Sequence, residues 1–229
     1  CTFGIIGVGH VGSKIEAMAR YLGLNVLLCD PPRAAAEGPE KFCSMEYLLE
    51  NSNVVTMHVP LDETTRGMAD ETFFALMRPG AIFINAARGE VIDEQALIAA
   101  EPKLGAVVID TWCHEPNINL DLLDVADIAT PHIAGYSLQG KQNATTMAVQ
   151  AVARFFGIDA LKDFIPHDDD PTHTPVLLDL KGKNHGEIAA VFQYNYPIFT
   201  DDFRLRMEPE KFEKLRGSYQ YRRDIYYNE

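Results

Sequence analysis

Short, wholly apolar runs recur along the N-terminal part of this 229-residue chain, and they constrain its fold more than any other feature. The runs do not alternate with polar residues, as strands with one solvated face do. Parallel strands that are covered on both faces have this unbroken apolar pattern. We expect such strands at Thr2–Ile6, Asn25–Cys29, Val54–His58, Ala81–Asn85, Gly105–Ile109 and Asp127–Ala129.

Helical stretches separate these runs. Asp93 precedes an apolar-periodic run and carries a side chain suited to cap its N-terminus. Alternating strands and helices predict an α/β fold, with a doubly wound parallel sheet in residues 1–157. The helices are expected at Val11–Leu22, Met45–Glu50, Asp70–Met77, Asp93–Ala100 and, longer, at Leu138–Phe156.

The first strand leads into Gly7-Val-Gly9-His-Val-Gly12, which has G-x-G-x-x-G spacing and opens a predicted helix. In that context Gly7 permits a tight turn, Gly9 lets the backbone approach a pyrophosphate, and Gly12 lets helix and strand pack closely. The helix N-terminus offers N–H groups to the phosphates. The pattern predicts a Rossmann-type dinucleotide site that includes His10 and Val11; a purely structural glycine-rich turn is the alternative.

Asp30 closes the second predicted strand. A carboxylate there can accept hydrogen bonds from the ribose hydroxyls of adenosine, and its charge would repel a 2′-phosphate. The sequence therefore favours NAD over NADP as the cofactor. Arg33 lies close in sequence and could partly offset that repulsion.

Three further polar segments follow predicted strands, at the edge where an open α/β sheet binds its ligands. They are centred on Arg88, on Asp110 with Glu115, and on His132. An arginine can bind a substrate carboxylate through two hydrogen bonds. A histidine can remove a hydroxyl proton as hydride leaves for nicotinamide, and a carboxylate can orient that histidine. The set suits oxidation of a hydroxyl group beside a carboxylate.

Residues 1–157 resemble the nucleotide-binding domain of the D-isomer-specific 2-hydroxyacid dehydrogenases. The resemblance rests on the glycine motif with Asp30, His58-Val-Pro60, Arg88-Gly89, Asp110…Glu115-Pro116 and His132-Ile-Ala-Gly135. It implies that Arg88 binds the substrate carboxylate, that His132 is the acid/base, and that Glu115 is its partner. It also implies that Asp110 holds the nicotinamide carboxamide. The other implied cofactor contacts are Val59, Pro60, Ala86, Ala87, Arg88 and Gly135.

Each catalytic candidate also has a structural interpretation. Arg88 could cap a strand through backbone carbonyls, Glu115 could be a solvated loop residue, and His132 could be a satisfied core histidine. His114 has no counterpart in the family pattern, so we interpret it as structural.

After Gly157 the alternation of apolar strands and helices ends. Residues 158–182 are predicted to be a linker with a polar, proline-rich segment, and residues 183–229 a small C-terminal α+β dimerisation domain. A core of this size is marginal alone. Its many aromatic side chains would form an apolar patch of a kind that monomers usually avoid. We therefore expect a homodimer built largely from residues 183–229.

The C-terminal part narrows the resemblance within the family. Phe212-Glu-Lys-Leu-Arg216, Tyr219-Gln-Tyr-Arg222-Arg223 and Tyr136-Ser-Leu-Gln-Gly-Lys141 resemble the members that oxidise 4-phospho-D-erythronate to its 2-oxo acid in pyridoxal 5′-phosphate biosynthesis. This implies a small phosphorylated 2-hydroxy acid as substrate, bound by Arg88 and Tyr136. The alternatives are another D-2-hydroxy acid, such as 3-phosphoglycerate, and a non-catalytic NAD-binding interaction module.

We also expect the chain to be part of a longer one. It lacks an initiator Met and enters a core strand at its second residue. Family members carry an N-terminal substrate domain of about 100 residues that has no counterpart here.

Composition excludes other classes of function. The chain has 33 acidic and 20 Lys or Arg residues, a formal charge of −13, so nucleic acids and anionic membranes are poor partners. The four cysteines include no C-x-x-C pair and no zinc-type spacing, so no metal site is predicted. Their scatter favours a reducing, cytoplasmic compartment.

Overall fold

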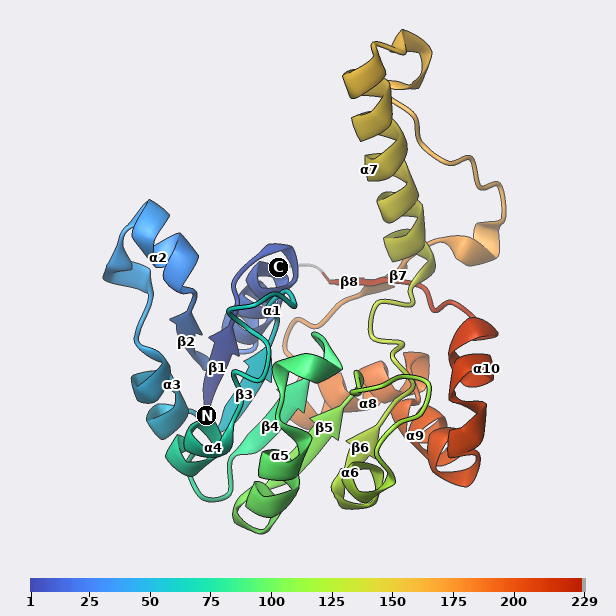
Figure 1. Cartoon of the computed structure of the whole chain (residues 1–229). Helices are drawn as coiled ribbons and strands as arrows, with labels where there is room; N and C mark the ends of the chain where they lie inside the picture. The colour runs from blue at the N-terminus through green and yellow to red at the C-terminus, as the bar shows by residue number, and fades with distance from the viewer. Residues whose placement is uncertain (228–229) are drawn as a thin grey trace. The chain divides into compact units, whose positions relative to one another are not determined.

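The computed structural model describes residues 1–227, which form two compact units (Figure 1). The first unit contains residues 1–134 and 198–217, and the second contains residues 135–197 and the chain from Ser218 onward. This division differs from the predicted boundaries at residues 157 and 183: the second unit begins at Gly135, and residues 198–217 return to the first unit. Asn228 and Glu229, which end the predicted C-terminal domain, lie outside the described residues.

Six parallel strands form the sheet of the first unit, which confirms the predicted fold class. Their order is β2-β1-β3-β4-β5-β6, so the strand order reverses at β1. In doubly wound sheets, ligands bind outside the carboxyl ends of the strands at such a reversal. The strands are β1 Thr2–Ile6, β2 Asn25–Cys29, β3 Val54–Met57, β4 Ile82–Asn85, β5 Ala106–Ile109 and β6 Ile128–Ala129.

Both faces of this sheet are covered by apolar side chains. Ile5 and Ile6 are adjacent in β1 and are 0% and 1% exposed, yet they belong to different apolar clusters. Successive strand residues point to opposite faces, so the two clusters lie on opposite sides of the sheet. Ala19 belongs to the Ile5 cluster and Phe83 to the Ile6 cluster. This two-sided burial is the physical reason for the unbroken apolar runs in the sequence.

Four helices of the first unit, α1, α3, α4 and α5, agree with the predicted ones, and α2, α6, α9 and α10 are additional. Asp93 accepts hydrogen bonds from the N–H groups of Gln95 and Ala96, as predicted for an N-cap. The unexpected α2 begins with two prolines, which the first turn tolerates because its N–H groups need no helical partner. The helices are α1 His10–Tyr21, α2 Pro31–Glu37, α3 Met45–Asn51, α4 Glu71–Leu76, α5 Glu94–Ala100, unexpected α6 Leu120–Val125, α9 Ile198–Met207 and α10 Phe212–Gly217.

Helices α9 and α10 complete the first unit at its short edge strand, β6. The carboxylate of Asp202 accepts a hydrogen bond of 2.7 Å from the N–H of Ala129 in β6. The Arg206 guanidinium forms an ion pair with the Asp202 carboxylate. It also donates hydrogen bonds to the carbonyls of Leu123 and Ala126. Leu205 and Phe212 are buried in the same apolar cluster as the sheet. Covering an edge strand in this way satisfies backbone groups that would otherwise be unpaired.

The second unit is built on one long helix, α7 (Leu138–Phe156). Ser137 caps its start and Gly157, in the left-handed conformation, ends it. The buried side chain of Gln139 bonds the carbonyl of His173 and the N–H of Asp224, next to the parallel strands β7 (Val176–Leu178) and β8 (Ile225–Tyr227). The unit also contains α8 (His185–Asn195), which opens with a capping box. Within residues 1–227, no helix is long and apolar enough to cross a membrane.

We expect Leu205→Ala to lower the free energy of unfolding by about 2–5 kcal/mol, because it leaves a cavity in the core of the first unit. Met207→Ala, on the same helix, is the control: its side chain is 64% exposed whereas Leu205 is 0% exposed. That variant should change stability by less than about 0.5 kcal/mol. Urea unfolding followed by circular dichroism measures both, and equal losses would contradict the assignment of α9 to this core.

Candidate functional site

The glycine loop between β1 and α1 is shaped by close backbone contacts. Gly7 has a φ of +84°, and a Cβ on Gly12 would lie 2.1 Å from the Gly7 carbonyl oxygen. A side chain at either position is therefore excluded. A Cβ on Gly9, in contrast, would meet nothing within 4 Å. The loop thus leaves open space at Gly9, where a pyrophosphate would approach the backbone.

Asp30 is fixed beside this loop by two backbone donors. One carboxylate oxygen accepts from the N–H of Val8 at 2.7 Å, and the other accepts from the N–H of Arg33 at 3.0 Å. The Arg33 side chain bonds both carboxylate oxygens of Glu37, at 2.6 and 2.7 Å, and also the Val8 carbonyl. The arginine that raised the possibility of NADP binding is therefore held by an acidic neighbour.

Two cavities follow the carboxyl ends of β1 to β4, and Val59 and Pro60 line both. One, of about 470 Å³, is bordered by Asp30 and by apolar side chains such as Met45. The other, of about 650 Å³, is lined by His10, Val11, His58, Val59, Pro60, Leu61, Ala86, Ala87 and Arg88. A mostly apolar cavity with the Asp30 and Asp62 carboxylates at its border suits an adenosine, and Arg88 lines the second cavity. Most of the sequence-predicted cofactor residues of the first unit thus line these two cavities, whereas Gly9, Gly12 and Asp110 line neither.

The side chain of Asn85 shapes the loop that carries Arg88. It accepts from the Ala87 N–H at 3.0 Å and donates to the Arg88 carbonyl at 2.9 Å. A Cβ on Gly89 would lie 2.0 Å from the Trp112 carbonyl carbon, so only glycine allows this loop to approach the next one. Arg88 itself is exposed, and its guanidinium donates to the Ala87 carbonyl. The arginine is therefore free to reorient toward an anion at this edge.

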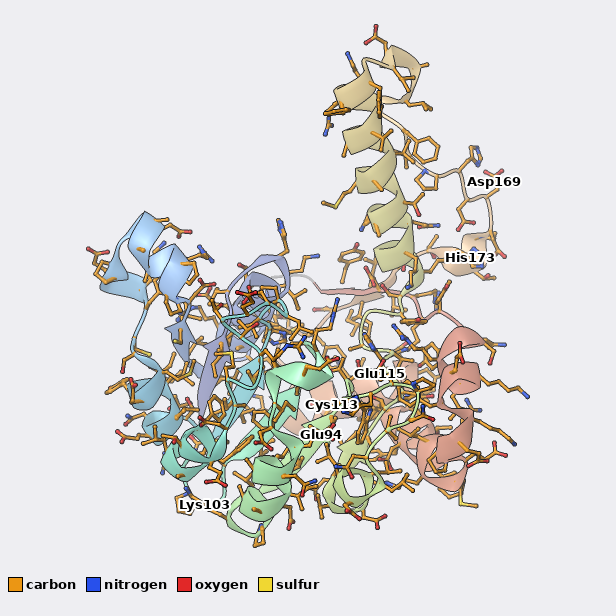
Figure 2. The ribbon with its side chains drawn as sticks, viewed as in Figure 1. Glu94, Lys103, Cys113, Glu115, Asp169 and His173 are labelled. Atoms are coloured by element: carbon orange, nitrogen blue, oxygen red, sulfur yellow. The ribbon has the colours of Figure 1, made fainter. Side chains whose placement is uncertain are left out.

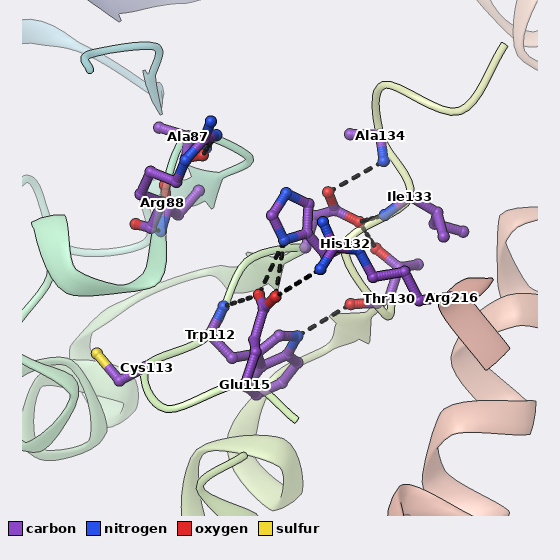
Figure 3. Close-up of polar contacts among 12 residues, drawn as sticks. Ala87, Arg88, Trp112, Cys113, Glu115, Thr130, His132, Ile133, Ala134 and Arg216 are labelled. Carbon is purple, nitrogen blue, oxygen red and sulfur yellow. Dashed lines mark hydrogen bonds and ion pairs between the residues drawn. The ribbon is translucent and has the colours of Figure 1, made fainter. Parts of the chain in front are cut away.

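His132 and Glu115 form a hydrogen-bonded pair (Figure 3). Nδ1 of His132 lies 2.8 Å from Oε2 and 3.1 Å from Oε1 of Glu115, and Oε1 also accepts from the Trp112 N–H at 3.0 Å. Their side chains are 21% and 17% exposed. His132 has a φ of +56°, an uncommon conformation for a residue other than glycine, and such strain clusters at functional sites.

Burial raises the pKa of the Glu115 carboxyl. The hydrogen bonds that it accepts from His132 and from the Trp112 N–H lower this pKa, and so do the charges of His132 and Arg216. Together they outweigh burial, so the pKa is lowered overall. Glu115 is thus held ionised. Because a carboxylate only accepts hydrogen bonds, Nδ1 of His132 carries the proton and Nε2 is left to exchange one.

Asp110 holds the loop that carries His132. Its carboxylate accepts from the Thr130 hydroxyl at 2.6 Å and from the N–H groups of Ile133 and Ala134 at 2.8 and 3.0 Å. Burial raises the pKa of this carboxyl despite these hydrogen bonds. Both of its oxygens are engaged in the loop, and its role toward nicotinamide stays a prediction.

The loop before Glu115 is also held from the side of α5. Oε1 of Glu94 accepts a hydrogen bond of 2.9 Å from the Cys113 N–H (Figure 2).

His114 in the same loop is exposed. Among residues 1–227, no group of three or more His, Cys, Asp or Glu side chains could hold a metal ion.

The other predicted site residues, Gly135 and Tyr136, belong to the second unit. There the Tyr136 ring packs against Tyr219 and Tyr221, with the Lys141 ammonium 4.0 Å from its centroid. One site residue was missed by the sequence: Arg216 of α10 lies 3.4 Å from Glu115. It is separated from Glu115 by 101 positions, so no local pattern could have indicated it.

Comparison with known proteins agrees with this geometry. Residues 1–134 match the family model described as "D-isomer specific 2-hydroxyacid dehydrogenase, NAD binding domain". The chain belongs to this family. The chain is also similar to solved structures. D-lactate dehydrogenase from Aquifex aeolicus, complexed with NAD and lactic acid, has a TM-score of 0.60 and 30% identity over 69% of this chain and 54% of its own. D-lactate dehydrogenase from Lactobacillus jensenii, with NAD⁺, has a TM-score of 0.58 and 30% identity over 68% of this chain and 53% of its own.

Relatives with another name match a longer part of the chain. Erythronate-4-phosphate dehydrogenase of Bacteroides thetaiotaomicron is 43% identical over 97% of this chain and 63% of its own. The enzyme of the same name from Porphyromonas gingivalis is 40% identical over 97% of this chain and 62% of its own. The chain thus spans less than two thirds of the length of these curated relatives.

The family membership makes NAD the cofactor of the first unit. Asp30 predicts that the cofactor site distinguishes NADH from NADPH. NADH should bind clearly more tightly than NADPH, and Asp30→Asn should narrow the gap, because it removes the charge that repels a 2′-phosphate. Asp70→Asn is the matched control, since Asp70 also caps a helix N-terminus but lines neither cavity. Fluorescence titration measures the affinities. Equal affinities of the unaltered protein for NADH and NADPH would contradict the assignment.

Proposed function

We propose that this chain is the cofactor-binding and C-terminal part of an enzyme that oxidises 4-phospho-D-erythronate to its 2-oxo acid with NAD. The family model covers only residues 1–134, whereas the erythronate-4-phosphate dehydrogenases are similar over 97% of the chain. That similarity includes the segments that follow Ala134, and it carries the proposal. The alternative within the family is another D-2-hydroxy acid, and the D-lactate dehydrogenase structures are similar over a smaller share of the chain.

The roles proposed for the site residues are those that the family resemblance implies, and the contacts of Glu115 with His132 support them. Arg88 binds the substrate carboxylate and keeps the reacting carbon beside the nicotinamide end of the cofactor site. Nε2 of His132 accepts the proton of the C2 hydroxyl as the C2–H bond breaks and the C2=O bond forms. NAD supplies the hydride acceptor. Glu115 then stabilises the imidazolium through Nδ1–H. In the reverse direction His132 returns the proton to the oxygen.

The remaining assignments are also proposals. Tyr136 contacts the substrate, and Asp110 and Gly135 contact the cofactor. The enzyme works in the cytoplasm, which is consistent with its four free cysteines.

The substrate proposal predicts an order of catalytic efficiency. We expect the enzyme that contains this chain to have a higher kcat/KM for 4-phospho-D-erythronate than for 3-phospho-D-glycerate, D-glycerate or D-lactate. A site built to pair a phosphate loses binding when that group is absent. NADH formation at 340 nm gives the four values. A higher kcat/KM for one of the other three acids would contradict the substrate assignment and leave the dehydrogenase assignment intact.

We also propose that the chain forms a homodimer through its C-terminal aromatic residues. Tyr194, Phe199, Phe203 and Tyr221 are 88%, 56%, 62% and 50% exposed. Exposure of several large apolar side chains marks an interaction surface. Phe155 and Phe156 at the end of α7 lie outside the predicted segment and are also exposed, at 83% and 69%.

Removing residues 183–229 would not test the dimer cleanly, because it would also remove Leu205 and Phe212 from the core of the first unit. We expect instead that Tyr194→Asp converts a dimer into a monomer in light scattering at micromolar concentration. Tyr47→Asp, on α3, is the control, because that tyrosine is also exposed, at 53%. A monomeric unaltered chain, or a dimer that survives Tyr194→Asp and Phe203→Asp together, would contradict the proposal.

A further inference from the structure

Helix α10 brings a second cation to the carboxylate that holds His132. Nη1 of Arg216 lies 3.4 Å from Oε2 of Glu115, and the same oxygen lies 2.8 Å from Nδ1 of His132 (Figure 3). All three residues belong to the first compact unit. One carboxylate oxygen is therefore shared between a permanent cation and a ring that gains and loses a proton.

The backbone at Arg216 is positioned by the packing of its helix. Its neighbour Phe212 is 1% exposed and Leu215 packs against the same apolar cluster, so the helix is anchored in the core. Nε of Arg216 is buried and has no hydrogen-bond partner among the described residues. A buried donor without a partner is costly, and a purely structural arginine would be expected to satisfy it. The guanidinium is instead directed at Glu115.

The charges around His132 come from several elements. Glu115 bonds its ring, Asp110 after β5 holds its loop and interacts with its charge, and Arg216 approaches Glu115 from α10. Glu94 of α5 contributes a further carboxylate at the Cys113 N–H. Among these groups Arg216 is the cation, and its charge opposes the pull of the carboxylates on an imidazolium proton.

We propose that Arg216 is a positioning residue of the acid/base pair, which acts by sharing the Glu115 carboxylate with His132. The positive charge of Arg216 weakens the attraction between Glu115 and the imidazolium. The His132 ring therefore releases its proton more readily after it has accepted one. This rests on the proposed function, since it concerns the same histidine. It also gives the returning C-terminal segment a part in the chemistry, because Arg216 lies more than 80 positions after His132 in the sequence but beside its partner in the fold.

The titration of the His132 ring tests the proposal without substrate or turnover. NMR of the chain with labelled histidines follows all seven rings, and His132→Gln assigns the signal. Arg216→Gln should raise the midpoint of the His132 titration by about 0.5 pH units or more, because it removes a like charge and frees the carboxylate. Arg216→Lys should restore most of the original midpoint. Arg204→Gln on α9 is the control, because it removes the same charge from a side chain that is 63% exposed.

If Arg216 acts through Glu115, a second result is expected. In a Glu115→Gln background, Arg216→Gln should shift the midpoint much less than it does in the unaltered chain. An unchanged midpoint in a folded Arg216→Gln protein, or an equal shift in the Glu115→Gln background, would overturn the proposal. Arg216→Met, which keeps the aliphatic stem, replaces Arg216→Gln if the latter does not fold. Failure of the enzyme to oxidise 4-phospho-D-erythronate would instead count against the proposed function and leave these midpoints unaffected.

Discussion

The ionised carboxylate of Glu115 is the interaction on which the candidate site depends. Burial alone would raise the pKa of this carboxyl, but donors from His132 and the Trp112 N–H reverse that effect. The same side chain thus joins the loop after β5 to the loop after β6. Removing this side chain would leave the His132 ring without its acceptor. The orientation of the acid/base is therefore set by a single group.

The rest of the first unit brings the other groups to this carboxylate. Parallel strands end at one edge of the sheet, and the reversal at β1 opens the crevice for the cofactor. Gly89 lets the Arg88 loop approach Trp112, which lies next to the pair. The Asp110 carboxylate then accepts from the Thr130 hydroxyl before His132 and from the Ile133 N–H after it. The fold supplies the position of each group, and the side chains at the strand ends supply the chemistry.

The sequence predicts what depends on local pattern and misses what depends on distant contacts. Unbroken apolar runs indicate strands buried on both faces, and Asp93 indicates a helix start, so the sheet and the cap were predictable. The return of α9 was not, because it depends on the Asp202 contact with Ala129 and on the burial of Leu205.

The candidate site, too, has features that the sequence predicts and features that it does not. The pairing of Glu115 with His132 followed from family motifs, and the cavities gather the predicted cofactor residues near Arg88. The hydrogen bonds of Asp110 to its loop, and the approach of Arg216, could not be predicted from spacing. Both arise only when segments far apart in the sequence meet in the fold.

Coupling between Glu115 and His132 in catalysis is the most direct test of this account. In the enzyme that contains this chain, kcat/KM is measured for Glu115→Gln, His132→Ala and the double variant. Loss of a general acid/base costs about 10²–10⁴-fold. The account predicts that the double variant is little slower than His132→Ala, because Glu115 acts through the histidine. Losses that multiply fully in the double variant would contradict it.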